Sequence, residues 1–406
     1  MTDWKIGAIT TLMAYGPHPE ERKRITRNRL ISLFKATGAL SKIEARKLSG
    51  YSMDALIGAF LSLESEGFIA AEASFAGISG KVAHAERYRL VEDRESCLGI
   101  GFTGEGIHSA LVGLSGALLA RRDDPFPGPL DSRAFVSFLQ DHLRAFYASG
   151  AVAALRWAPS LAVIAVPGDC DWERAFLRRS NLLPEVVDVD LAAAVRSVAG
   201  DVRLVARRNV EGIVSAALKD GSLSGDGGRT LVVSAISAPV HALVQDGILI
   251  FSDGEMEHLS VAGDGPVCRC GRTGCVGTLF SATAFGRLFP EAATPASIRA
   301  SLAADEAEGR FDRKLAVDKA FDGVADALLN LCAAFSPHEV LLTGALFGAS
   351  ADPEAEIASR FRRANVRGDW IPRSIRYRDY READAAIGLC LAVQDELRMN
   401  GTATIR

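Results

Sequence analysis

The sequence predicts an α/β protein in which a small unit of helices and a hairpin precedes a large body of two similar lobes. Two patterns carry this prediction: a tight helix-turn-helix with capping residues near the N-terminus, and a repeated order of three strands and a helix in the body. The composition agrees with a folded chain, since 48% of the 406 residues are apolar and 24% are charged. These values exclude disorder as the main state, and the length leaves room for about two to three domains.

Residues 20–92 are predicted to form the small first unit. Apolar side chains at helical spacing over 27–36 predict one helix. A second helix begins after Ser41, where Glu44 completes a capping-box pattern, and a third begins after Ser52. Two short apolar stretches then predict a hairpin. Three helices, a tight turn and a hairpin are typical of a winged helix-turn-helix, a unit that binds DNA in many proteins.

The body, residues 93–406, contains two stretches in which three short strands precede a helix. The sequence predicts strands at 97–102, 108–113 and 117–120 before a helix at 132–149, and strands at 230–236, 238–245 and 248–252 before a helix at 316–335. We expect one lobe over 93–205 with a C-terminal helix at 383–398, and the other over 206–382. Two related lobes with a cleft between them are the plan of the ribonuclease-H-like fold, which sugar kinases and actin-like ATPases share. The pattern-free residues 1–19 are expected to form a flexible arm.

Three of the seven cysteines lie within eight residues, at Cys268, Cys270 and Cys275. Glycines between them allow the loop to turn so that the thiols converge. Structural zinc takes four ligands in a tetrahedron, and His258, ten residues upstream, can supply the fourth donor. We therefore predict a structural Zn²⁺ site formed by three thiolates and one imidazole. The alternative is that these are free cysteines.

The order Gly-Glu-x-x-His over 254–258, followed by Cys-x-Cys-Gly-x-x-Gly-Cys over 268–275, resembles the ROK family (repressor, open reading frame, kinase). This family joins bacterial sugar kinases with transcriptional repressors, and the repressors add an N-terminal winged helix to the kinase-like body. The chain looks like the longer type, and the resemblance covers nearly all of it beyond about residue 20. It implies a homodimer or homotetramer.

The resemblance also implies that the kinase residues are lost. Gly99 stands where the family has an acidic residue, Phe102 replaces a glycine of the phosphate loop, and Arg208 stands where the family has its catalytic Asp. A guanidinium stays protonated and cannot act as a general base. We therefore predict no catalytic residues. If the alignment is shifted, Asp201 or Glu211 is the base of an ATP-dependent kinase for a hexose or an N-acylhexosamine, which is the alternative function.

The sugar pocket that the resemblance implies is only partly retained. Glu255 matches a carboxylate that binds a sugar hydroxyl in the family, but Gly277 replaces the next sugar-binding Glu. Arg207 and Arg208 favour an anionic sugar derivative as the effector. The alternative is that both arginines are surface residues paired with nearby carboxylates. The predicted ligand-binding residues are therefore Glu255, Arg207 and Arg208.

The first unit is more basic than the body, with a net charge of about +4 over 20–90 in a chain whose net charge is −4. This asymmetry favours double-stranded DNA as its partner. The third helix, however, begins with few base-reading side chains, and Asp54 opposes the phosphates. The alternative is a protein-binding or dimerisation unit. The predicted DNA contacts are Arg22, Lys23, Arg24, Lys42, Ser52, Met53 and Lys81.

Together these patterns predict a ROK-type transcriptional regulator, which the family resemblance implies is a repressor, with a degenerate kinase body that senses a sugar or sugar-derived effector. The sequence has no apolar run of the about 18 residues that span a bilayer and no signal-peptide pattern, so we expect a cytoplasmic protein that does not bind membranes. A ligand-binding scaffold that no longer contacts DNA is a further alternative.

Overall fold

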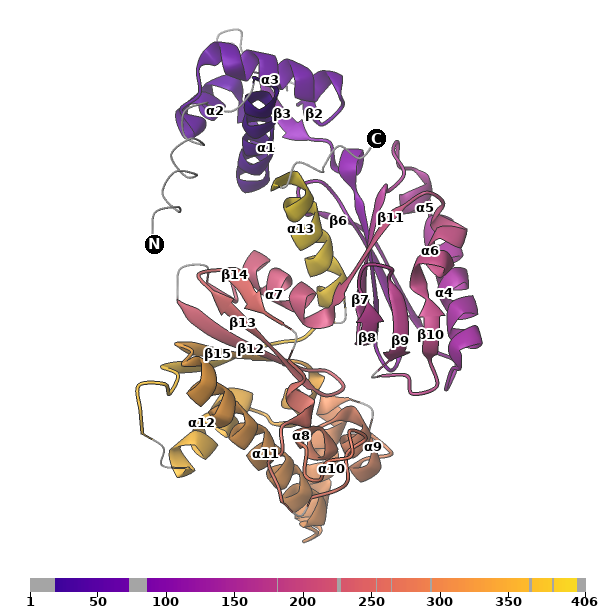
Figure 1. Cartoon of the computed structure of the whole chain (residues 1–406), viewed down its shortest axis with the longest axis vertical. Helices are drawn as coiled ribbons and strands as arrows, with labels where there is room; N and C mark the ends of the chain where they lie inside the picture. The colour runs from indigo at the N-terminus through magenta and orange to yellow at the C-terminus, as the bar shows by residue number, and fades with distance from the viewer. Residues whose placement is uncertain are drawn as a thin grey trace, which may run out of the picture.

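The computed structural model describes residues 19–72, 86–180, 182–224, 228–252, 254–263, 265–292, 294–364, 367–381 and 383–399. A small N-terminal unit lies on one end of a body with two lobes (Figure 1). The expected arm lies outside these residues, apart from Pro19, where the first helix begins. No described helix is long and apolar enough to cross a membrane.

The N-terminal unit is a winged-helix arrangement of three helices and a three-stranded sheet in the order β1-β3-β2. Both predicted caps are confirmed: Ser41 and Glu44 form a reciprocal capping box, and the Ser52 side chain accepts a hydrogen bond from the Ala55 N–H. The elements are α1 (Pro19–Thr37), β1 (Ala39–Ser41), α2 (Lys42–Ser49), α3 (Met53–Ser65), β2 (Ile69–Ala71) and β3 (Arg87–Leu90).

A compact apolar core holds this unit together. Phe60 of α3 packs edge-on against Tyr88 of β3, with ring centroids 5.3 Å apart, and also contacts Phe34 of α1. Helix α1 begins eight residues earlier than the predicted 27–36 segment, at Pro19. Its first turns are rich in charged residues and bury no apolar stripe, so hydrophobic spacing could not reveal them.

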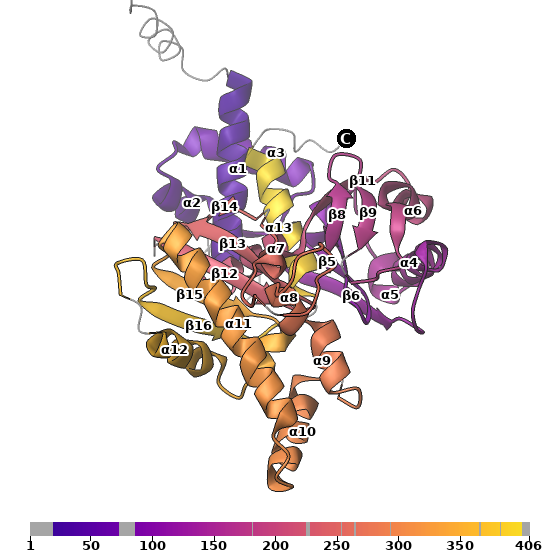
Figure 2. The same ribbon diagram turned by 60° about the horizontal axis from the view of Figure 1, so that its bottom comes forward.

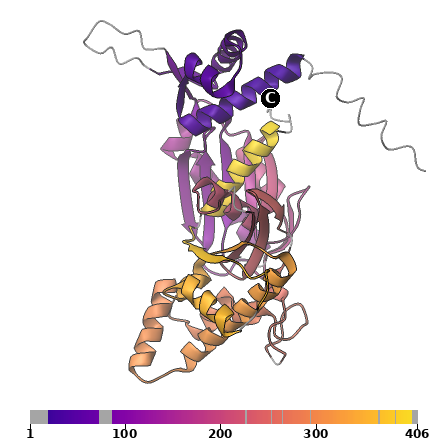
Figure 3. The same cartoon turned by 90° about the vertical axis from the view of Figure 1, so that its left-hand side faces the viewer.

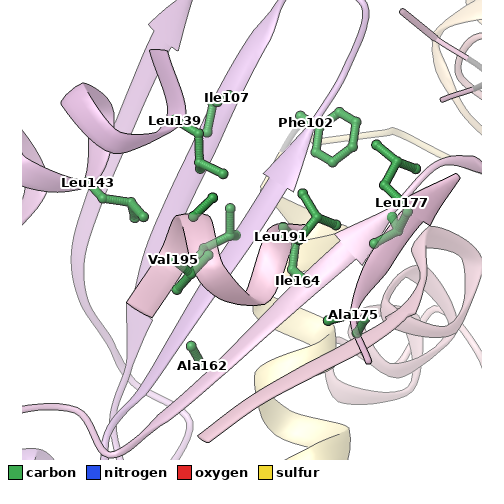
Figure 4. Packing of buried hydrophobic residues seen from close by; sticks show 14 of the residues in the cluster. Phe102, Ile107, Leu139, Leu143, Ala162, Ile164, Ala175, Leu177, Leu191 and Val195 are labelled. Carbon is green, nitrogen blue, oxygen red and sulfur yellow. The ribbon is translucent and has the colours of Figure 1, made fainter. Parts of the chain in front are cut away.

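The first lobe contains a five-stranded sheet in the order β11-β7-β4-β5-β6. Strands β4, β5 and β6 are antiparallel, whereas β7 and β11 run parallel to β4. Side chains on one face pack against α4 and α6 (Figure 4). The elements are η1 (Glu92–Glu95), β4 (Cys97–Phe102), β5 (Gly106–Val112), β6 (Leu118–Pro125), α4 (Ser132–Tyr147), α5 (Gly150–Ala153), β7 (Leu161–Val166), α6 (Leu191–Ala199) and β11 (Arg203–Arg208).

A second, three-stranded antiparallel sheet belongs to the same lobe, in the order β10-β9-β8. Its strands are β8 (Gly168–Asp171), β9 (Phe176–Ser180) and β10 (Val187–Asp190). The predicted boundary between residues 205 and 206 is wrong, because it cuts through β11, all of which pairs with β7 in the first sheet.

The second lobe repeats the plan of the first, with a sheet in the order β14-β13-β12-β15-β16. Again three antiparallel strands continue into two parallel ones, which confirms the predicted duplication and the ribonuclease-H-like, sugar-kinase-type fold. The elements are α7 (Asn209–Lys219), β12 (Arg229–Ala235), β13 (Pro239–Gln245), β14 (Ile248–Phe251), η2 (Met256–His258), α8 (Val276–Leu279), α9 (Ala282–Leu288), α10 (Pro295–Ala307), α11 (Asp312–Phe335), β15 (Glu339–Thr343), η3 (Ala345–Ala349), α12 (Pro353–Arg363) and β16 (Ser374–Arg378).

Two helices occupy the middle of the molecule, α7 and α13 (Asp384–Met399) (Figure 2). They cross closely because glycines face each other: a Cβ on Gly388 would lie 1.8 Å from the Gly212 carbonyl oxygen. Helix α13 covers the face of the first sheet opposite α4, whereas α7 also packs on the second sheet. The crossing therefore joins the two lobes.

Candidate metal centre and interlobe cleft

The four predicted metal ligands lie together in the second lobe. His258 ends η2, and Cys268, Cys270 and Cys275 come from the loop before α8. Their donor atoms all lie within 4.8 Å of one another. The loop depends on Gly274, which has φ +67° and whose added Cβ would lie 1.5 Å from the Ala262 carbonyl oxygen, so only glycine fits this close approach.

The distances between the donors fit a tetrahedral cation site. The Cys268 Sγ lies 3.4 Å from the His258 Nδ1, and the Cys270 Sγ lies 3.6 Å from the Cys275 Sγ. Zinc with Zn–N of about 2.0 Å and Zn–S of about 2.3 Å requires edges of about 3.5 and 3.8 Å in a tetrahedron. The geometry also indicates that Nδ1 is the ligand atom of His258.

The other imidazole nitrogen of His258 faces carboxylates. Its Nε2 lies 3.4 Å from a Glu255 oxygen and 3.7 Å from a Glu257 oxygen. A carboxylate on the second nitrogen fixes the ring orientation of a metal-binding histidine. Burial among the sulfurs raises the pKa of Cys275 to about 12, so its thiolate form requires a nearby cation such as a metal ion.

A small cavity lies in the cleft between the lobes, with a volume of about 80 Å³. Its walls include Thr103 and Arg208 from the first lobe, Asn209 at the start of α7, and Ser237 and Glu255 from the second lobe. Ligand pockets usually measure about 300–1,000 Å³, so this cavity offers less free volume than a typical ligand site. Because Glu255 lines the cavity and contacts His258, the metal centre and the cleft share one wall.

The structure separates the two arginines that were predicted to bind a ligand. The Arg208 guanidinium lies 5.0 Å from the centre of the Trp172 ring, at the cavity wall. Arg207 instead forms ion pairs with Glu211 at 3.8 Å and with Glu396 at 3.5 Å. Adjacent strand residues point to opposite faces, so Arg208 lines the cavity whereas Arg207 does not, and the ion pairs of Arg207 fit the alternative of a residue paired with nearby carboxylates.

The alternative bases of a shifted alignment are poorly placed. Asp201 precedes β11, at the end of the strand that is away from the cavity. At a rise of about 3.3 Å per residue, the chain between Asp201 and Arg208 places them about 20 Å apart. Glu211 accepts a hydrogen bond from the Arg208 backbone N–H at 3.3 Å and interacts with Arg207. At Gly99 a side chain has no room, since an added Cβ would lie 2.6 Å from the Ala386 carbonyl oxygen of α13.

The predicted DNA contacts are arranged unevenly on the winged helix. Lys42 contacts another residue of the winged helix: its ammonium donates a hydrogen bond to the Tyr88 hydroxyl at 3.0 Å and lies over the Tyr88 ring. Ser52 is exposed but caps α3 through its hydroxyl. Met53 begins α3 and is half-buried. Lys81 lies outside the described residues.

The remaining predicted contacts, Arg22, Lys23 and Arg24, lie on the exposed first turns of α1. Lys23 and Arg24 form exposed pairs with Glu20 and Glu21, and such pairs contribute little energy and exchange easily.

Sequence reasoning did not single out several residues of the site. Asn209 and Ser237 line the cavity, and the Trp172 ring supports Arg208. Glu257 is buried and pairs with Arg269 at 2.5 Å beside the metal centre. Only Glu257 carried a signal, because a carboxylate directly before a metal-binding histidine indicates a second ligand shell.

Residues 246–396 match the ROK family. The chain is also similar to a ROK family transcriptional regulator, a homologue of the Escherichia coli Mlc protein, with a TM-score of 0.69 and 17% identity over 93% of this chain and 98% of that one. No curated protein matches in sequence.

Kinases of the same fold are similar over a smaller part of the chain. A ROK hexokinase from Thermus thermophilus has a TM-score of 0.55 and 18% identity over 75% of this chain and 99% of that one. A ROK family glucokinase from Streptomyces griseus, solved with glucose and AMPPNP, has a TM-score of 0.57 and 16% identity over 73% of this chain and 98% of that one. The protein therefore has the sugar-kinase-like fold of these ROK structures, and the match of residues 246–396 to the ROK family agrees with the resemblance seen in its sequence.

Proposed function

We propose that this protein is a ROK-type transcriptional repressor whose body has lost kinase activity and senses a sugar or a sugar-derived ligand. The observation that carries the proposal is the winged helix seated on a kinase-like body in which Arg208 lies at the cleft, at the position expected for the base. A guanidinium cannot accept the proton of a sugar hydroxyl. The solved ROK regulator shares this architecture over most of the chain.

The absence of space at Gly99 supports the loss of activity. In the expected alignment a kinase carries an acidic side chain there, but α13 fills that space through Ala386 and Cys390. A carboxylate could enter only if α13 moved away from β4. We therefore infer that the first phosphate loop has lost its acidic group and that α13 has packed into the room that this group requires.

We propose that the Cys₃His centre holds structural Zn²⁺. Three sulfurs and one imidazole are donors that zinc prefers, and four protein ligands leave no open position for catalysis. The ion would fix the loop from residue 258 to 275 and thereby the position of Glu255 at the cleft. Thiolate ligands suit a reducing compartment, so we place the protein in the cytoplasm.

Helix α13 is the proposed route from the cleft to the winged helix. The Asn28 side chain of α1 donates a hydrogen bond to the Arg398 carbonyl oxygen at 2.8 Å, and Lys35 pairs with Asp395 at 2.6 Å. Figure 3 shows the end of α13 lying beneath α1. Helix α13 also crosses α7, and the start of α7 lines the cavity. A ligand that moves α7 would therefore move α13 and change its contacts with the winged helix. We expect the active species to be a homodimer or homotetramer.

The test combines DNA and kinase assays on the same preparation. The purified protein is incubated with fragmented genomic DNA, and the bound fragments are sequenced and footprinted. Specific sites that are lost on replacement of Arg22 and Arg24 by Gln, but retained in the control Arg133→Gln/Arg203→Gln, support a DNA-binding regulator. A coupled assay with ATP and a panel of hexoses and hexosamines should show no turnover, and ATP-dependent turnover would overturn the proposal.

One observation favours a second candidate, a scaffold that binds protein through the winged helix. Helix α3 contains no Lys or Arg, and its exposed side chains include Ile57 and Leu61. Such a face suits an apolar partner better than a phosphate backbone. A salt titration of binding to random duplex DNA distinguishes the two, because a flat response would indicate no phosphate contacts.

A further inference from the structure

A second cavity lies where the winged helix meets the body. It shares no lining residue with the interlobe cavity or with the candidate metal centre. Its volume is about 650 Å³, within the about 300–1,000 Å³ of small-molecule sites. One wall belongs to the winged helix, through the end of α1 and strand β3. The other belongs to the body, through the turn between β5 and β6 of the first lobe and the end of α7 of the second.

Three cations line this cavity against one carboxylate. Lys35 comes from α1, Arg89 from β3 and Lys219 from the end of α7, whereas the only acid among its lining residues is Glu92. Glu92 accepts a hydrogen bond from the Ser115 backbone N–H at 2.9 Å. The lining therefore carries a net positive charge in a chain whose net charge is −4.

These cations are poorly neutralised. Lys35 pairs with Asp395 at 2.6 Å, but within the described parts of the chain no carboxylate lies within ion-pair distance of Arg89 or Lys219. Burial lowers the pKa of Lys35, and the charges of Arg398 and Lys219 lower it further, whereas Asp395 opposes them. An anion in this cavity would relieve the repulsion among these groups.

The turn opposite Arg89 leaves space for such an anion. Gly116 has φ +91°, and a Cβ there would lie 2.8 Å from the Leu391 side chain and 3.3 Å from the Lys219 Nζ. The glycine thus keeps the turn open beside the Lys219 ammonium. The Ser115 hydroxyl of the same turn is a further lining group that can donate to an anion.

We propose that this cavity, bounded by Lys35, Arg89, Ser115 and Lys219, binds a small phosphate-bearing metabolite. Phosphate oxygens accept the several hydrogen bonds that one guanidinium, two ammonium groups and a hydroxyl offer. Lys35 and Arg89 belong to the winged helix, and Lys219 belongs to the body. A ligand held by all three would therefore bridge the two units. The site does not depend on DNA binding or on the sugar cleft.

The test is calorimetric titration of the full chain with inorganic phosphate, pyrophosphate and glucose 6-phosphate, with glucose as the uncharged control. The variant Arg89→Gln/Lys219→Gln removes two cations from the cavity. The control Arg133→Gln/Arg203→Gln removes the same charge from exposed positions elsewhere on the body. We expect at least one phosphate compound to bind the parent and the control, with affinity at least tenfold lower in the cavity variant.

Either of two kinds of result would overturn the proposal. One is the same affinity in all three proteins, or no heat with any of the phosphate compounds. The other is loss of duplex DNA binding in the cavity variant while the parent binds none of the small phosphates, which would assign these cations to a nucleic-acid backbone. Circular dichroism spectra identical to that of the parent show that a lost affinity is not a loss of folding.

Discussion

The crossing of α7 and α13 predicts that Gly388→Ala destabilises the protein, although alanine is the better helix former. The added Cβ would lie 1.8 Å from the Gly212 carbonyl oxygen, about 1.5 Å closer than a short C–H···O contact allows. Backbone cannot rotate away as a side chain can, so we expect the upper part of the about 1–3 kcal/mol range for overpacking. The higher helix propensity of alanine relative to glycine offsets about 1 kcal/mol of this loss. The net expectation is a loss of about 2 kcal/mol in the free energy of unfolding.

The measurement is urea unfolding followed by far-ultraviolet circular dichroism. Gly286→Ala is the matched control, because Gly286 is an exposed helical glycine of α9 with nothing within 4 Å of its built Cβ. This control should be stabilised by up to about 1 kcal/mol. Opposite signs for the two variants confirm the close crossing, and a Gly388→Ala protein as stable as the control would refute it.

Further predictions concern three other groups. Arg378→Met removes the partner of the buried Asp384, 2.7 Å away, and should cost about 3–5 kcal/mol in urea unfolding because a buried charge is left unpaired; a cost below 1 kcal/mol would contradict this. Cys270→Ser should reduce the zinc content found by elemental analysis, and unchanged stoichiometry would refute the ligand assignment. Hydrogen bonds from Arg313 and Arg310 lower the pKa of Asp305 to about 2. The stabilisation by Asp305 is therefore present above about pH 4 and lost as pH falls toward 2, so the melting-temperature difference between the parent and Asp305→Asn should shrink over that window.

The sequence predicted elements whose signals are local. Ser41 with Glu44 marked the start of α2, and the central strands of both large sheets, β4, β5, β7, β12, β13 and β15, stood out as buried apolar runs. The convergence of the four candidate metal ligands was predictable because three thiols lie on one loop and one imidazole lies ten residues away. Their convergence follows from loop geometry that glycines permit, without long-range contacts.

Features that depend on distant contacts could not be predicted in this way. Strands β8, β9 and β10 are short and partly polar, and they are strands because they pair with one another. Lys42 reads as a DNA contact in sequence, but the Tyr88 ring, 46 residues away, holds its ammonium. The separation of Arg207 from Arg208 required the register of β11, which fixes the face to which each side chain points.

Helix α13 has a consequence for the order in which the protein is completed during synthesis. The winged helix leaves the ribosome before the lobes, yet Asn28 and Lys35 await partners in α13 that lie 370 and 360 residues further along the chain. Synthesis must add about 300 residues between the end of the winged helix and α13. At about 5–20 residues per second this interval lasts about 15–60 s. During that time a nascent chain exposes a folded winged helix before the lobes that would restrain it exist.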